Sequence, residues 1–153
     1  MPDPEERLAS LGLSVPEVAK PVADYVPAVR SGNHVFTSGQ LPMRDGNLVA
    51  TGKVGGGVTA EVAVECAQQC ALNALAAVKS EIGDLAKVSR VVKVVAFVAS
   101  TPDFTGQPQI ANGASELFGA VFGDSGRHAR SAVGVPVLPL NAPVEVELIV
   151  EVT

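Results

Sequence analysis

The C-terminal stretch HARSAVGVPVLPLNAPVEVELIVEVT, from His128 to Thr153, carries the pattern that decides the fold class. In residues 144–152, valine or leucine at every even position alternates with Glu145, Glu147, Ile149 and Glu151. Successive side chains of a strand point to opposite faces, so this alternation predicts a strand with one apolar and one acidic face. Residues 130–137 alternate in the same way, with Ser131, Val133, Val135 and Val137 on one face and Arg130, Ala132 and Gly134 on the other.

A proline-marked turn around residues 138–140 predicts that these two strands pair as a hairpin with both valine rows buried. Arg130 and the glutamates then share the outer face. A tight turn places Glu147 opposite Arg130 and Glu145 opposite Ala132, whereas a looser turn places Glu151 opposite Arg130. An arginine and a carboxylate on such a face form either part of a site or a surface ion pair that contributes little stability.

The composition indicates one globular domain. The chain has 153 residues, of which 47% are apolar and 18% charged, with a net charge of −5. This acidic balance disfavours a nucleic-acid binder, which normally presents a basic stripe. No apolar run is long enough for a membrane span, and the acidic N-terminus is unlike a signal peptide, so we expect a cytoplasmic protein.

The remaining elements alternate between strand and helix. A hairpin is expected over residues 28–38, a short strand over 47–50, one helix between Thr59 and Gly83, and a second between Pro108 and Gly123. This order predicts an α+β fold with both helices on one sheet face. We take residues 1–20, with a short helix near residues 5–13, as an N-terminal extension and residues 21–153 as a single domain.

Residues 88–99, VSRVVKVVAFVA, predict a strand that is apolar on both faces, with only Lys93 interrupting one of them. Two helices cover one face, so a second copy of the chain is expected on the other. The alternative is a sheet that closes on itself. Cys66 and Cys70 are expected to be small buried apolar side chains, because their spacing on a helix suits neither a disulfide nor a metal site.

No metal, dinucleotide or catalytic-triad pattern is present, so neither a metal site nor a cofactor is expected. Arg130, a tyrosine, backbone amides and a glutamate remain, a set that suits recognition of a small carboxylate. Residue type alone favours a packing role for Tyr25, a cap-like role for Asn112 and an exposed loop position for His128.

Two sequence motifs include several of these candidate residues. The first is Ala129-Arg130-Ser131 followed by Leu138-Pro139 and the run VEVE from Val144, and the second is the run TSGQLP from Thr37 with Tyr25 upstream. Together they resemble the RidA/YjgF family of enamine/imine deaminases, whose members also carry the older name endoribonuclease L-PSP. The resemblance implies a single mixed sheet of chorismate-mutase-like type and a homotrimer around a central sheet barrel.

The resemblance also implies cofactor-independent hydrolysis of reactive 2-imino or enamine acids to 2-keto acids and ammonia, in clefts between subunits. Arg130 would hold the substrate carboxylate and Glu145 would position the water. The other implied substrate-binding residues are Tyr25, Ser38, Gly39, Asn112 and Ala132. Ala132 stands where many members carry cysteine, and residues 126–128 replace a common proline, so the chain resembles a longer branch of the family. The alternative is a protein that binds a small carboxylate such as a 2-keto acid without turnover.

Overall fold

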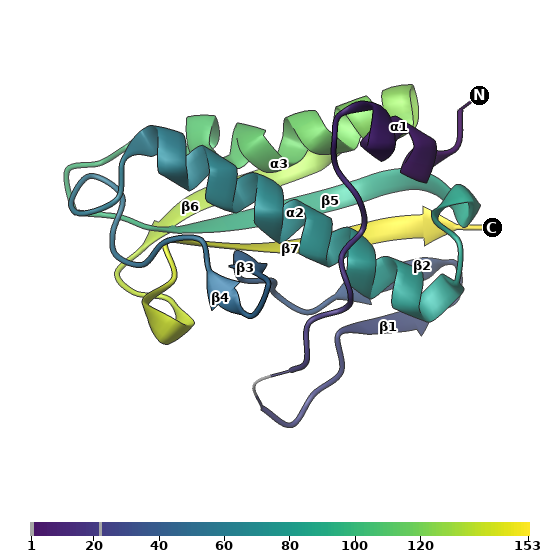
Figure 1. The fold of residues 1–153 in the computed structure, drawn as a ribbon, viewed down its shortest axis with the longest axis horizontal. Helices are drawn as coiled ribbons and strands as arrows, with labels where there is room; N and C mark the ends of the chain where they lie inside the picture. Colours follow the sequence, from purple (N-terminus) through teal and green to yellow (C-terminus); the bar gives the residue numbers. More distant parts are fainter. Residues whose placement is uncertain (1, 22) are drawn as a thin grey trace.

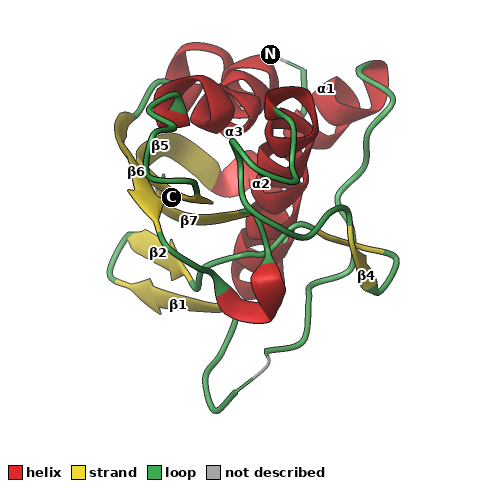
Figure 2. Cartoon of the chain, turned by 90° about the vertical axis from the view of Figure 1, so that its left-hand side faces the viewer, coloured by secondary structure: helices red, strands yellow, loops and turns green. Residues whose placement is uncertain are grey.

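A computed structural model of the chain describes residues 2–21 and 23–153. Two long helices, α2 (Ala60–Ile82) and α3 (Gln107–Phe122), cover one face of a five-stranded sheet (Figures 1 and 2). The strand order is β1-β2-β7-β5-β6, and only the β5–β6 pair is parallel. The strands are β1 (Ala28–Ser31), β2 (His34–Thr37), β5 (Val88–Ala99), β6 (Ala129–Val135) and β7 (Val144–Val152). A small separate ribbon joins β3 (Met43–Arg44) to β4 (Asn47–Leu48). The predicted α+β class with helices on one sheet face is confirmed.

The long helices begin and end where the sequence predicts. The Thr59 side chain accepts a hydrogen bond from the Val62 amide, and Gly83 ends α2 with a φ of 85°. Its central stretch is buried on nearly every side, because α3 and the N-terminal segment cover what the sheet leaves open. Cys66 and Cys70 are free thiols in this interior, as expected. Burial raises the pKa of Cys66 to about 11 and raises that of Cys70 well above its usual range.

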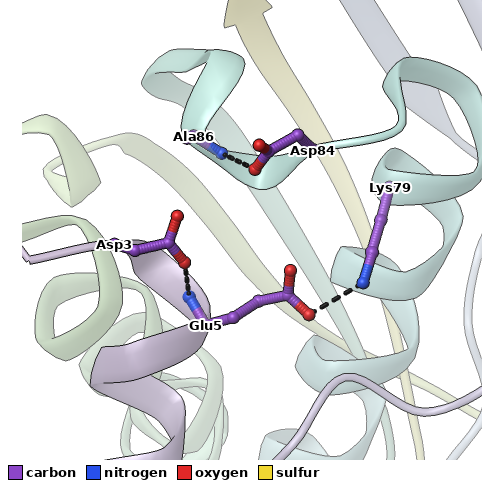
Figure 3. Close-up of polar contacts among 5 residues, drawn as sticks. All are labelled: Asp3, Glu5, Lys79, Asp84 and Ala86. Atoms are coloured by element: carbon purple, nitrogen blue, oxygen red, sulfur yellow. Dashed lines mark hydrogen bonds and ion pairs between the residues drawn. The ribbon is translucent and has the colours of Figure 1, made fainter.

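The N-terminal segment packs on the domain. Helix α1 (Pro4–Ser10) is capped by the Asp3 side chain and buries Leu8 completely. Glu5 reaches Lys79 at the end of α2 with an N–O distance of 2.8 Å, next to the turn capped by Asp84 (Figure 3). The chain then crosses the outer side of α2 before it reaches β1 (Figures 1 and 2). Residue 1 of the expected extension lies outside the described residues.

The predicted C-terminal hairpin is wrong, although both of its strands exist. β6 pairs with β5 in parallel, and β7 lies on the opposite edge of β5, where it pairs antiparallel with both β5 and β2. The connection includes a short 3₁₀ helix, Pro139–Asn141, and carries the chain past the end of β5. Helix α3 makes the crossover that a parallel β5–β6 pair requires. Neither proposed register between Arg130 and a glutamate therefore occurs within one chain.

The face assignment of β6 is also reversed. Through the β5 register, Arg130 lies in line with Val94 and Leu148, which are buried beneath the helices. Val133 lies in line with Phe97 and Glu145 on the uncovered face, and it is 44% exposed. The predicted faces of β7 are confirmed, because its valines are buried and its glutamates alternate with them on the uncovered face.

Candidate functional site

Arg130 is held by α3. Its Nη1 donates to Asn112 Oδ1 at 2.7 Å and to Ser115 Oγ at 3.2 Å. Asn112 and Ser115 are three residues apart on α3, so both side chains lie on the helix face that meets β6. Asn112 is thus a partner of Arg130 and not the cap-like residue that its type suggests. Both residues belong to the site that the resemblance implies, and the structure shows that they are in contact.

The guanidinium of Arg130 has unused binding capacity. Among residues 2–21 and 23–153 it forms no ion pair, and only its Nη1 has hydrogen-bond partners. Asn112 and Ser115 are neutral, so they orient the group without cancelling its charge. A planar guanidinium with a free edge is suited to bidentate binding of a carboxylate.

Glu145 packs against Gly39. A Cβ built on Gly39 would lie 2.7 Å from Glu145 Cδ and 3.0 Å from its Oε1, so a side chain here would displace the carboxyl group. Two backbone hydrogen bonds between Gln40 and Val146, of 2.8 and 3.0 Å, fix this contact. Burial, followed by the nearby charge of Glu147, raises the pKa of Glu145. A carboxylate that is partly dehydrated in this way is a stronger base than an exposed one.

Ser38 precedes Gly39 in the chain and is bonded to the loop of Tyr25. The Ser38 hydroxyl donates to the Val26 carbonyl at 2.6 Å, and the Ser38 amide donates to Pro27, so Ser38 fixes the loop that carries Tyr25. Tyr25 is half-exposed and lines a cavity of about 650 Å³ together with Glu145. The predicted residues therefore form two groups, one around Arg130 and Asn112 and the other around Glu145, Gly39, Ser38 and Tyr25. Ala132 is on the same side as Arg130 and packs against the core.

The same cavity contains polar residues that the sequence did not single out. Gln69 and Asn73, both buried on α2, are joined by a 3.1 Å hydrogen bond between Gln69 Nε2 and Asn73 Oδ1. Asn73 also donates to the carbonyls of Leu41 and Met43, and Arg44 donates to Gln69. Two polar residues four apart on the buried side of the helix, among alanine, cysteine and leucine, are the signal that would have identified them.

Arg130 and Glu145 themselves lie on opposite faces of the sheet. Arg130 faces α3, whereas Glu145 belongs to the uncovered face, two strands away across β5. The uncovered face also carries exposed apolar side chains, with Val29 52%, Phe36 44% and Val133 44% exposed. A site containing both Arg130 and Glu145 therefore requires residues from two copies of the chain.

The described residues were compared with the requirements of a membrane-spanning helix and of a metal site. None of the helices in residues 2–21 and 23–153 has the length and apolarity needed to cross a bilayer. Within the same residues, histidine, cysteine and carboxylate side chains form no group of three or more that would hold a metal ion.

The chain belongs to the family described as "YjgF/chorismate_mutase-like, putative endoribonuclease", whose model matches residues 5–152. This match confirms the resemblance drawn from the sequence motifs.

Individual relatives are similar over nearly their whole length. Protein TCP17 of Trypanosoma cruzi is 46% identical over 145 residues, which cover 94% of this chain and 91% of the relative. A protein of Dermatophagoides farinae named 2-iminobutanoate/2-iminopropanoate deaminase is 39% identical over 138 residues, which cover 90% of this chain and 93% of the relative. The crystal structure of a protein of unknown function from Agrobacterium tumefaciens has a TM-score of 0.92 at 48% identity, covering 98% of this chain and 92% of that one.

Proposed function

We propose that this protein hydrolyses reactive 2-imino acids to 2-keto acids and ammonia, in clefts between copies of the chain. The observation that carries the proposal is the guanidinium of Arg130, which has no ion-pair partner among the described residues. Asn112 and Ser115 orient it through Nη1, and its other N–H donors are free to bind a ligand. The Dermatophagoides relative with a deaminase name supports the choice of substrate class.

In the proposed reaction, the free edge of Arg130 binds the substrate carboxylate through two parallel hydrogen bonds. The carbon of the adjacent C=N bond is then held near Glu145 of the neighbouring copy. Glu145 takes a proton from a water molecule as that water attacks this carbon, and it returns the proton to the nitrogen, which gives a carbinolamine. Glu145 then transfers the hydroxyl proton of the carbinolamine to the nitrogen, the C–N bond breaks, and ammonia leaves a 2-keto acid. An enamine acid enters the same path after it tautomerises to the imine.

The same geometry supports pairing of copies of the chain. Arg130 and Glu145 cannot meet within one chain, and the apolar face around Phe36 and Val133 is uncovered. We propose that these faces join in a homotrimer around a central sheet barrel, and that Tyr25, Ser38 and Gly39 line each cleft. The expected support is a mass of three chains by light scattering coupled to size-exclusion chromatography; a monomeric mass would contradict it.

The test compares Arg130→Ala with Arg127→Ala, an exposed arginine three positions earlier in the same segment. Ammonia release from 2-iminopropanoate, generated in place by an amino-acid oxidase acting on alanine, is measured above the spontaneous rate. Arg130→Ala should lower kcat/KM by roughly two orders of magnitude or more, since it removes two charge-assisted hydrogen bonds. Arg127→Ala should match the wild type.

Two other outcomes would change the conclusion. Wild-type turnover in Arg130→Ala would refute the assignment of Arg130. Pyruvate binding by the wild type that depends on Arg130 but occurs without turnover would leave the site a carboxylate-binding one and favour a regulatory protein over an enzyme.

A further inference from the structure

His128 is held at both ring nitrogens. Its Nδ1 lies 2.6 Å from the carbonyl oxygen of Gly126 and its Nε2 lies 2.8 Å from Ser115 Oγ. The ring also packs edge-on against Phe118, with centroids 6.0 Å apart and an interplanar angle of 87°. His128 is therefore half-buried and fixed, and the exposed loop position expected from the sequence is wrong.

These contacts determine which atom donates in each hydrogen bond around His128. A carbonyl oxygen only accepts, so Nδ1 of a neutral His128 carries the hydrogen and Nε2 is left as an acceptor. The Ser115 hydroxyl then donates to Nε2, which leaves its oxygen lone pairs free for Arg130 Nη1 at 3.2 Å. The chain of donors runs from Arg130 through Ser115 and His128 to the backbone of Gly126.

We propose that Ser115 and His128 are positioning residues that fix the rotation of the Arg130 guanidinium. Nη1 is held by Asn112 and by Ser115, and two acceptors on one nitrogen define the plane of the group. The opposite edge is then presented to a carboxylate in one orientation, before the ligand arrives. Hydrogen bonds in such a chain also polarise one another, which strengthens the Ser115 acceptor. This inference rests on the proposed role of Arg130 in binding a carboxylate.

The sequence around the chain of donors fits this role. His128 stands two residues before Arg130 and directly before β6, so the segment that places the arginine against α3 also places the histidine there. In the sequence it belongs to the segment where the family resemblance leads one to expect a proline. A proline side chain carries no group that can accept a hydrogen bond, so Ser115 would lose its acceptor there.

Four variants separate positioning from packing. Ser115→Ala removes the hydroxyl, whereas Ser115→Thr retains it. His128→Phe keeps the ring packed on Phe118 but removes both nitrogens, whereas His128→Gln keeps an acceptor near the position of Nε2. Ser80→Ala is the matched control, because Ser80 is also a helix serine and, within the described part of the chain, its hydroxyl bonds to the Ala77 carbonyl alone.

The first readout needs no ligand. Nitrogen-15 NMR of the wild type should show His128 with its proton on Nδ1, and the Arg130 side chain should be ordered. In Ser115→Ala and His128→Phe the Arg130 side chain should become mobile, while Ser115→Thr, His128→Gln and Ser80→Ala leave it ordered. A proton on Nε2 of the neutral ring, or an Arg130 side chain equally ordered in Ser115→Ala, overturns the inference.

The second readout is pyruvate binding by calorimetry. Ser115→Ala and His128→Phe should each raise the Kd about fivefold, the effect of one ordinary hydrogen bond, with Ser115→Thr and His128→Gln within twofold of the wild type. Unchanged affinity in Ser115→Ala also overturns the inference. If the wild type binds no pyruvate, the proposed function fails, and the NMR result still decides whether Ser115 and His128 hold Arg130.

Discussion

Replacing Gly39 with alanine should impair catalysis without impairing the fold. The new Cβ would lie 2.7 Å from Glu145 Cδ, whereas ordinary contact begins at 3.4 Å. The carboxyl group must therefore move by at least about 0.7 Å. Gly39 does not have a left-handed φ, so its backbone accepts alanine without strain.

The two effects of Gly39→Ala differ in size. The clash involves the far end of a flexible side chain, which can move aside. Alanine also restricts the unfolded chain more than glycine does, which offsets about 0.4–1 kcal/mol of the cost. The free energy of unfolding should therefore change by about 1 kcal/mol or less. A displacement approaching 1 Å of a catalytic group can reduce the rate by about 100-fold, so we expect a fall in kcat of about 10- to 100-fold. KM should change little, because Arg130 is untouched.

The assay is ammonia release from 2-iminopropanoate, with denaturant unfolding measured on the same preparations. Gly119→Ala is the matched control, since its Cβ would meet nothing within 4 Å. It should keep the wild-type rate. A wild-type kcat in Gly39→Ala would refute the reasoning that the Glu145 carboxyl group acts from its position against Gly39.

Four further variants test pH dependence and stability. Because burial and then Glu147 raise the pKa of Glu145, Glu147→Gln should shift the acid limb of the kcat profile to lower pH; an unmoved limb would contradict this. Between the ordinary carboxyl pKa and the raised pKa of Glu145, the folded chain holds a proton that the unfolded chain has released. The free energy of unfolding therefore falls as the pH rises through this window, and this contribution is constant above it. Unfolding titrations of Glu145→Gln should lack that fall. Leu8→Ala should lower the free energy of unfolding by about 2 kcal/mol, since Leu8 is fully buried, whereas Glu5→Gln should cost less than about 1 kcal/mol because its pair with Lys79 is partly exposed.

The helices and strands could be predicted from the sequence because their caps and alternation patterns depend only on neighbouring residues. Thr59 and Gly83 bound α2, and the alternation in residues 144–152 gave β7 with the correct buried face. Strand partners were not readable, because backbone ladders form between any two strands of suitable shape. The proline-marked turn suggested a hairpin, yet β5 offers two edges, and β6 and β7 take one each.

The site was readable only in part. The motifs contain Arg130, Gly39 and Glu145, and the family resemblance added Asn112. The structure shows Arg130 in contact with Asn112, and Gly39 in contact with Glu145. That Arg130 and Glu145 lie on opposite faces depends on strand order, which no local pattern encodes. The hydrogen bonds from Ser115 to both Arg130 and His128 could not be predicted from the sequence either. They depend on how α3 packs against the segment that contains both residues.

Subunit complementation tests the central claim most directly. Arg130→Ala and Glu145→Gln are each expected to be inactive, and they are unfolded together at equal amounts, refolded, and confirmed as mixed oligomers by native mass spectrometry. If each site takes Arg130 from one copy and Glu145 from its neighbour, about a quarter of the sites regain both residues, and about a quarter of the wild-type activity returns. Mixed oligomers that remain as inactive as either parent would contradict the account.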